Sequence, residues 1–167
     1  MKQKYMTQKY TSANTSINKT KVPAIFHRIR WEPGTTNLDW GGGKYDTATE
    51  YLKRFGVKNI IYDPFNRSQE ENEAALAGTY DTATLSNVLN VIAEPEIREE
   101  AVLGALGHLK PGGALYISIY EGNHSGRGRE SKPDCWQCSM PLKAYAKELA
   151  GLHPWILRGM IMIVKED

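Results

Sequence analysis

Three consecutive glycines, Gly41, Gly42 and Gly43, follow Asp39 in the segment NLDWGGGKYD. The segment 36–40 is predicted to be a short strand, and a helix capped by Asp46 is predicted to follow. Glycines between a strand and a helix let a ligand approach the backbone closely, where the helix N-terminus presents N–H groups. This pattern therefore indicates a binding site for a small molecule with polar or charged groups.

Asp63 supplies a second signal, because it ends the next predicted strand, 58–62, about 20 residues beyond the glycines. An acid at that place accepts hydrogen bonds from ribose hydroxyls in nucleoside-binding domains. The two features together, in a strand–helix–strand unit, favour a nucleoside-containing ligand. The alternative is that the glycines only form a tight turn and that Asp63 only starts the loop before Pro64.

Apolar spacing along the rest of the chain predicts alternating strands and helices. The chain is expected to fold as an α/β, Rossmann-like open sheet in three αβα layers, mostly parallel and with an antiparallel C-terminal edge strand. Helices are predicted at 22–30, 46–56, 68–78, 94–109 and 139–151, with Ser68 and Glu71 as a capping box and Ser139 as a cap. Strands are predicted at 36–40, 58–62, 82–88, 114–120, 155–157 and 160–164, and residues 121–139 are predicted to be a long loop.

The bulk properties fit one domain. The chain has 167 residues and a net charge of +2, so we expect a single domain over 22–167 behind a polar arm, 1–21. No run reaches the roughly 18 apolar residues that a membrane span needs. Without a secretory signal, and with only two cysteines, the protein is expected in the cytoplasm, with no membrane partner.

Four segments resemble the motifs of class I, Rossmann-like S-adenosylmethionine-dependent methyltransferases, with small phage and bacterial types the most similar. NLDWGGGKYD resembles the first motif, YDPFN the ribose-binding motif, YDTATLSNVLNVI the fourth strand with its loop, and LKPGGALYISIYEG the following helix end, turn and strand. The resemblance covers about residues 36–120. It implies S-adenosylmethionine as the cofactor.

The resemblance also implies roles for individual residues. Asp39 would orient the turn or contact the methionine amine, and the glycines would pass beneath the methionine and ribose. Asp63 would hold the ribose hydroxyls, with Pro64 and Phe65 beside the adenine. Ser86 and Asn87, and Asn90 one turn later, would face the cofactor or the acceptor, although loop and helix capping is an equal alternative for the two asparagines.

The chain departs from the family pattern in three ways. Lys44 stands where a last glycine is usual, and only about 17 residues separate Asp63 from Asp81, which leaves no room for the usual third strand. No Asn-Pro-Pro-Tyr, Asp-Pro-Pro-Tyr or Pro-Cys motif is present, which argues against methylation of base amines or of cytosine C5.

The predicted function is thus a methyltransferase whose acceptor, a nucleic acid or a small molecule, stays open. One alternative is a non-catalytic sensor or partner subunit that binds S-adenosylmethionine, and another is a nicotinamide dinucleotide-binding protein. Candidate bases are His27, Tyr120, Glu121 and His124, none of them compelling, so the catalytic residues are unknown. Cys135 and Cys138 could hold zinc only with two further ligands such as His124 and His153, so no metal is expected.

Overall fold

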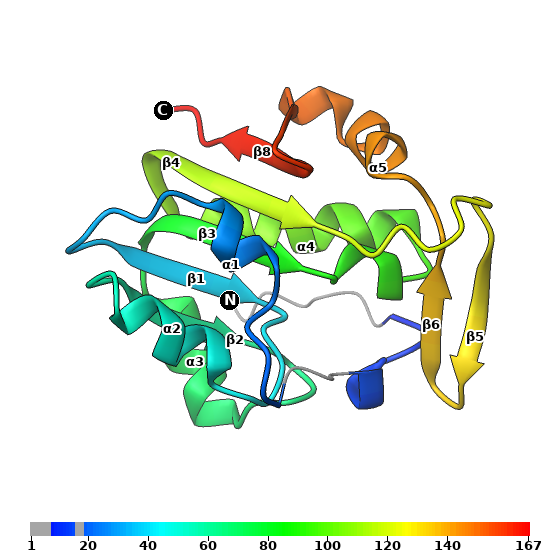
Figure 1. Ribbon diagram of the computed structural model, residues 1–167, viewed down its shortest axis with the longest axis horizontal. Helices are drawn as coiled ribbons and strands as arrows, with labels where there is room; N and C mark the ends of the chain where they lie inside the picture. The colour runs from blue at the N-terminus through cyan, green and yellow to red at the C-terminus, as the bar shows by residue number, and fades with distance from the viewer. Residues whose placement is uncertain (1–7, 16–18) are drawn as a thin grey trace.

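A six-stranded sheet forms the centre of the molecule (Figure 1) in the computed structural model, which describes residues 8–15 and 19–167. The strands are β1 (Thr36–Trp40), β2 (Lys58–Tyr62), β3 (Tyr80–Ser86), β4 (Leu109–Ser118), β7 (Trp155–Leu157) and β8 (Met160–Val164). Their order is β2-β1-β3-β4-β8-β7. The first four strands of this order are parallel, whereas β8 and β7 are antiparallel to their neighbours. The predicted fold class is confirmed.

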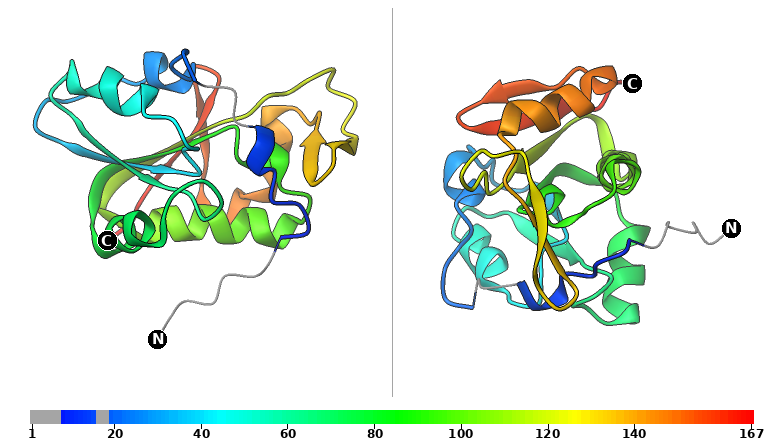
Figure 2. Two further views of the ribbon diagram at one scale, coloured as in Figure 1. Left: turned by 90° about the horizontal axis from the view of Figure 1, so that it is seen from below. Right: turned by 90° about the vertical axis from the view of Figure 1, so that its right-hand side faces the viewer.

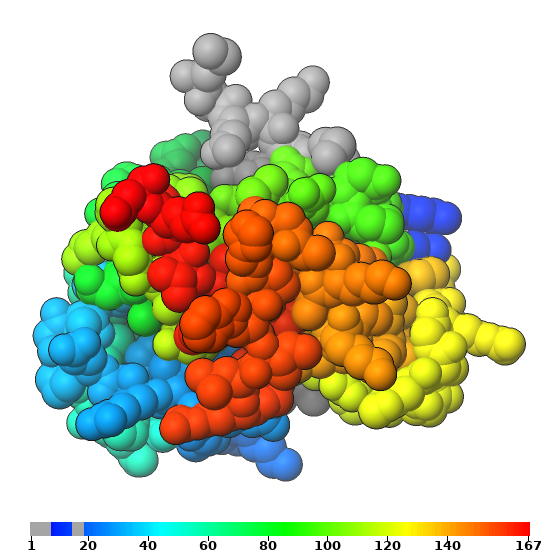
Figure 3. All heavy atoms as spheres, turned by 90° about the horizontal axis from the view of Figure 1, so that it is seen from above, coloured from blue at the N-terminus to red at the C-terminus, as the bar shows by residue number. Residues whose placement is uncertain are grey.

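Helices cover both faces of the sheet and complete three layers (Figure 2). On one face, α1 (Ile25–Arg28) and α2 (Thr47–Lys53) pack in one apolar cluster that also holds Met160 of β8. On the other face, α3 (Gln69–Ala77), α4 (Pro95–Gly107) and α5 (Leu142–Glu148) share a larger cluster with the central strands. The C-terminal segment, orange to red, lies over one side of the molecule in the space-filling view of Figure 3.

The helices change faces where the chain reverses its direction across the sheet. The chain moves outward from β1 to β2 through α2, and then crosses back over β1 to β3 through α3. Because such crossovers are right-handed, the reversal places α3 on the face opposite α2. The carboxyl ends of β1 and β3 thus form a topological switch point, which is where open α/β sheets bind their ligands.

β2 is an edge strand, as the short spacing between Asp63 and Asp81 predicts. Only the turn after β2 and helix α3 connect it to β3, and no strand of the described residues pairs with its outer edge. The capping box is also confirmed, because Ser68 Oγ accepts from Glu71 N and Glu71 Oε2 accepts from Ser68 N. The third strand that is usual in the resembled family is therefore missing from this part of the chain.

The predicted loop over 121–139 is wrong, because its second half forms a hairpin of β5 (Gly128–Lys132) and β6 (Cys135–Cys138). The hairpin was missed because every residue of β5 is exposed, so its sequence, GRESK, has no alternation of apolar and polar residues to indicate a strand. Two short 3-10 helices contact β6: η1 (Ala13–Thr15) and η2 (Leu89–Val91). The hairpin thereby joins the N-terminal arm to the loop after β3.

Several predicted boundaries are corrected. The helix predicted over 22–30 is only α1, and the helix predicted over 94–109 ends at Gly107. β3 runs over Tyr80–Ser86 instead of 82–88. β4 starts at Leu109 instead of 114, because Leu109 pairs with Tyr80 ahead of the Pro-Gly-Gly turn, where the register between the two strands shifts. α5 follows Pro141 rather than Ser139, and Asp46 precedes α2 without a capping hydrogen bond because its carboxylate pairs with Arg67.

Gly104 of α4 allows the close approach of helix and sheet under the site. A Cβ at Gly104 would lie 2.6 Å from Cη2 of Trp40, the last residue of β1, whereas a Cβ at Gly107 would meet nothing within 4 Å. We expect Gly104→Ala to lower the free energy of unfolding by roughly 1–3 kcal/mol through overpacking. The matched variant Gly107→Ala should be neutral or stabilise by up to about 1 kcal/mol. Urea unfolding measures both, and equal effects would contradict this packing argument.

Candidate active site

A cavity of about 630 Å³ opens at the switch point, above the carboxyl ends of the parallel strands. Loops after β1, β2, β3 and β4 line it, together with α4, the arm and β6. Every predicted site residue lies in its wall: Asp39, Gly41, Gly42, Gly43, Asp63, Pro64, Phe65, Ser86 and Asn87. The tertiary structure thus brings together residues from three separate loops.

The glycine turn leaves no space for side chains. Gly41 and Gly43 have φ angles of +75° and +77°, which favour glycine. A Cβ at Gly41 would lie 2.7 Å from Val88 Cγ2, and one at Gly42 would lie 2.5 Å from Asp39 Oδ2. The turn is therefore a cradle of bare backbone, in which a side chain at Gly41 or Gly42 would collide with Val88 or Asp39. Lys44, which replaces the family's usual glycine, is exposed and places its ammonium 5.4 Å from the centre of the Tyr45 ring, so it does not obstruct the turn.

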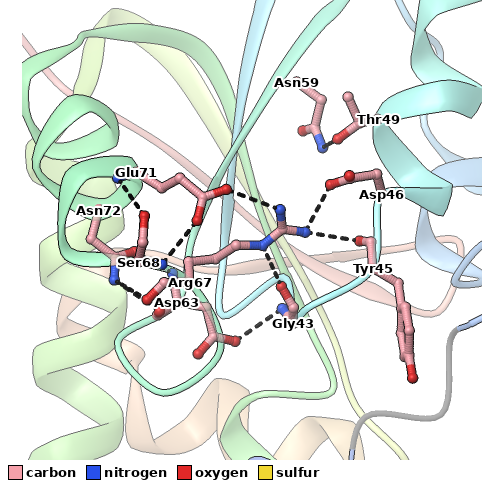
Figure 4. Close-up of polar contacts among 10 residues, drawn as sticks. All are labelled: Gly43, Tyr45, Asp46, Thr49, Asn59, Asp63, Arg67, Ser68, Glu71 and Asn72. Atoms are coloured by element: carbon pink, nitrogen blue, oxygen red, sulfur yellow. Dashed lines mark hydrogen bonds and ion pairs between the residues drawn. The ribbon is translucent and has the colours of Figure 1, made fainter.

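Asp63 fastens this turn to the loop after β2. Its Oδ2 accepts from Gly43 N at 2.9 Å and from Asn66 Nδ2 at 3.2 Å, and its Oδ1 accepts from the N–H groups of Phe65 and Asn66. Asn72 of α3 in turn bonds both the N–H and the carbonyl of Asp63, each at 2.9 Å. The carboxylate is thus a structural tie as well as a wall of the cavity (Figure 4).

Arg67 is a further supporting residue that the sequence analysis missed. Its Nε donates to Gly43 O at 2.8 Å and its NH2 donates to Tyr45 O at 3.1 Å, while Asp46 and Glu71 pair with its guanidinium (Figure 4). The guanidinium therefore holds the chain on both sides of Lys44. No motif in the sequence indicates this role, because the contacts join segments more than 20 residues apart in the chain.

Asp39 is buried beside this clamp, at 2% exposure. Thr84 Oγ1 donates to its Oδ1 at 3.0 Å, and Thr84 also accepts from Asn37 in a polar row across β1 and β3. Burial raises the pKa of Asp39 from 3.8 to about 7, and the neighbouring Asp63 charge adds to the increase, whereas the Thr84 hydrogen bond and Arg67 oppose it. The carboxyl group thus titrates near neutrality, where a nearby cation would favour its charged form.

A raised pKa at Asp39 makes the stability of the protein depend on pH. Between pH 4 and 7 the folded state binds a proton there that the unfolded state has lost, so this group's contribution falls as pH rises through that window. We expect Asp39→Asn to gain roughly 2–3 kcal/mol of stability relative to wild type from pH 5 to pH 8, at about 1.4 kcal/mol for each pH unit between pH 5 and the pKa near 7.

Urea unfolding at both pH values measures this difference. Asp81→Asn is the matched control, because the hydrogen bonds of Asp81 with Lys110 and Thr36 lower its pKa below 3.8 and it is ionised throughout the range. The difference in unfolding free energy between Asp81→Asn and wild type should therefore be the same at both pH values. If the difference for Asp39→Asn were also the same at both pH values, the raised pKa of Asp39 would be contradicted.

The N-terminal arm and the hairpin form the roof of the cavity. Gln8, Thr11 and Ser12 of the arm line it together with Gln137 of β6. The arm is attached at several points: Thr11 N donates to Asp134 Oδ1 at 3.0 Å, Lys9 N donates to Glu94 Oε1 at 2.9 Å, and the Tyr10 ring stacks on Trp136. Residues 1–7 and 16–18 of the predicted arm lie outside the described residues.

Of the candidate bases, Tyr120 is the one found in the cavity wall. Glu121 pairs with His124 at 2.8 Å and accepts from Leu142 N. His27 bonds Tyr51 Oη at 3.0 Å. None of these three candidate bases is among the described residues that line the cavity.

Cys135 and Cys138 are buried, free thiols at the two ends of β6. No three His, Cys, Asp or Glu side chains of residues 8–15 and 19–167 gather in a way that could hold a metal ion.

The sequence matches the model of a methyltransferase domain family over residues 16–152. The chain belongs to this methyltransferase family. It is therefore an S-adenosylmethionine-dependent enzyme, and the resemblance of its motifs is confirmed. Among curated proteins, no sequence matches that of the chain.

Solved structures share the fold of this methyltransferase. A 1,6-didemethyltoxoflavin-N1-methyltransferase of Burkholderia thailandensis, solved with S-adenosylhomocysteine, is 19% identical with a TM-score of 0.66, over 86% of this chain and 76% of that one. A methyltransferase of Methanosarcina mazei is 15% identical with a TM-score of 0.61, over 87% and 98%. A sugar N-methyltransferase of a Streptoalloteichus species is 15% identical with a TM-score of 0.56, over 80% and 81%.

Proposed function

We propose that this methyltransferase holds S-adenosylmethionine in the cavity and transfers its methyl group to a small molecule bound beside it under the roof. The observation that carries the proposal is the glycine turn, which presents bare backbone to the cavity and has no room for a side chain at Gly41 or Gly42. The volume of about 630 Å³ lies in the range of small-molecule sites. When bound, the cofactor supplies an activated sulfonium methyl group, so the protein has chiefly to position the reactants and exclude water.

Asp39 and Asp63 fit two different parts of this cofactor. Asp39, buried against the turn, suits the ammonium of the methionine part, since a cation beside it offsets the cost of burying its charge. Asp63 suits the ribose hydroxyls, which would replace Asn66 Nδ2 at Asp63 Oδ2. That contact is the longest of the four at 3.2 Å and comes from a side chain that can rotate away. Phe65, 43% exposed at the cavity, offers a face to the adenine in the absence of the family's usual third strand.

A small-molecule acceptor is favoured over a nucleic acid by the cavity's composition. The described residues of its wall include no Lys, Arg or His, whereas binding of nucleic acids depends on cationic contacts to phosphates. The toxoflavin-precursor and sugar N-methyltransferases that share the fold carry names of small-molecule acceptors. These names support the proposal at the level of the fold.

The expected location in the cytoplasm remains a prediction. Within the described residues, no helix is both long and apolar enough to cross a membrane. The two cysteines are free, which agrees with a reducing compartment.

Cofactor binding is tested by calorimetry with S-adenosylmethionine, S-adenosylhomocysteine and NAD. We expect wild type to bind the first two and not NAD, and Gly41→Ala to lose this binding because its Cβ would collide with Val88. Gly34→Ala is the matched control: Gly34 also has a positive φ, +83°, but nothing lies within 4 Å of a Cβ there. Both variants carry a similar backbone strain of roughly 1–2 kcal/mol, so only the cradle distinguishes them.

Two outcomes would contradict the proposal. The first is that S-adenosylhomocysteine does not bind even near 1 mM, where a binding free energy of only about −4 kcal/mol is needed. This result would contradict the assignment of the cavity as the cofactor site. Equal binding by Gly41→Ala and Gly34→Ala would place the cofactor elsewhere. Transfer from labelled S-adenosylmethionine to small molecules then separates a catalyst from a domain that only binds the cofactor.

A further inference from the structure

A chain of three amide and carbonyl groups determines the orientation of Asn90 in the cavity wall. Gln137 Nε2 donates to Cys138 O at 3.0 Å, and a carbonyl can only accept, so Gln137 Oε1 must face the other way. Asn90 Nδ2 donates to this oxygen at 3.4 Å. The remaining oxygen, Asn90 Oδ1, is buried and has no hydrogen-bond partner in the described part of the chain. The whole residue is only 2% exposed.

A buried acceptor without a partner is costly and calls for a donor. Asn90 lines the cavity, so a ligand can supply that donor. Asn90 lies in η2, in the loop after β3, and contacts the hairpin, whereas Asp63 and Phe65 follow β2. Two strand spacings of about 4.8 Å separate β2 from β3 across β1, or roughly 10 Å in all. Asn90 is therefore placed toward the acceptor end of the cavity and away from the ribose end.

The charges of the wall restrict the acceptor further. Its described ionisable side chains, tyrosines apart, are all acids: Asp39, Asp63 and Glu100. Among these side chains, an anionic acceptor would meet only like charges and would find no protein cation to pair with. A neutral or cationic acceptor meets no such repulsion.

We propose that the acceptor is a neutral or cationic small molecule that donates a hydrogen bond, from an amine, amide or hydroxyl group, to Asn90 Oδ1. Asn90 is then a specificity-determining residue, and Gln137 positions it by preventing its amide from turning over. This inference rests on the proposed function, since it takes the rest of the cavity as the cofactor site.

The test uses the full chain saturated with S-adenosylhomocysteine and pairs of probes that differ in the donor and the charge. The pairs are nicotinamide with nicotinate, benzamide with benzoate, and tryptamine with indoleacetate, and ligand-observed NMR titration gives each dissociation constant. We expect the amide and amine members to bind wild type at least about tenfold more tightly than their carboxylate partners, which is the size of effect that one buried hydrogen bond produces.

Two variants assign the preference to the amide chain. Asn90→Leu should weaken the binding of the amide and amine probes, and so remove the hydrogen-bond part of the preference while the acidic wall still disfavours the carboxylates, and it should keep wild-type affinity for S-adenosylhomocysteine. Gln137→Leu removes the group that orients Asn90, so it should narrow the ratio of nicotinamide to nicotinate affinity without abolishing binding. Asn123→Leu, on an exposed loop outside the described lining, is the matched control and should change nothing.

Each contrary outcome has a separate meaning. Carboxylates that bind as tightly as their partners, or no binding of any amide or amine to the cofactor-loaded protein, would overturn the acceptor assignment alone. A loss of S-adenosylhomocysteine affinity in Asn90→Leu as large as the loss of probe affinity would assign Asn90 to the cofactor and also overturn it. If wild type failed to bind S-adenosylhomocysteine at all, the proposed function would fail first.

Discussion

The site depends on the carboxylate of Asp63, which holds the glycine turn and the loop after β2 in one fixed relation. The N–H groups of Gly43, Phe65 and Asn66 all point at it. A backbone turn with positive φ angles gains nothing from side-chain packing, so it needs such external ties to keep one conformation. Arg67 adds a second tie by donating to the carbonyl of Gly43. The cavity lies against this turn, whose conformation these contacts hold in place.

The same ties set the electrostatics of the cavity. The charge of Asp63 lies close enough to Asp39 to add to the burial that raises the pKa of Asp39, and Arg67 on the far side of the turn only partly compensates. Because the guanidinium lies behind the turn and outside the described lining, the cavity itself presents acids alone. Such a wall suits a cofactor with a sulfonium and an ammonium group. It is a poor surface for a phosphorylated acceptor.

The roof of the cavity is built from two segments that lie far apart in the chain. The arm precedes the first helix, and the hairpin lies between β4 and α5, yet Asp134 at the hairpin's tip binds both Thr11 and Ser12 of the arm. Ser12 Oγ also donates to Val91 O, next to Asn90. This part of the cavity wall therefore consists of segments that are remote in sequence and that depend on each other for their placement.

The sequence by itself determined the alternation of strands and helices in a mostly parallel sheet, the glycine turn, the edge position of β2 and the predicted residues that line the cavity. These features follow from local signals: apolar periodicity, positive-φ glycines, a capping box and the spacing between Asp63 and Asp81. The tertiary structure alone decided the Arg67 clamp, the raised pKa of Asp39, the hairpin and the free oxygen of Asn90. Their physical basis is burial and hydrogen bonding between segments far apart in the chain, and the exposed β5 strand has no apolar pattern to reveal it.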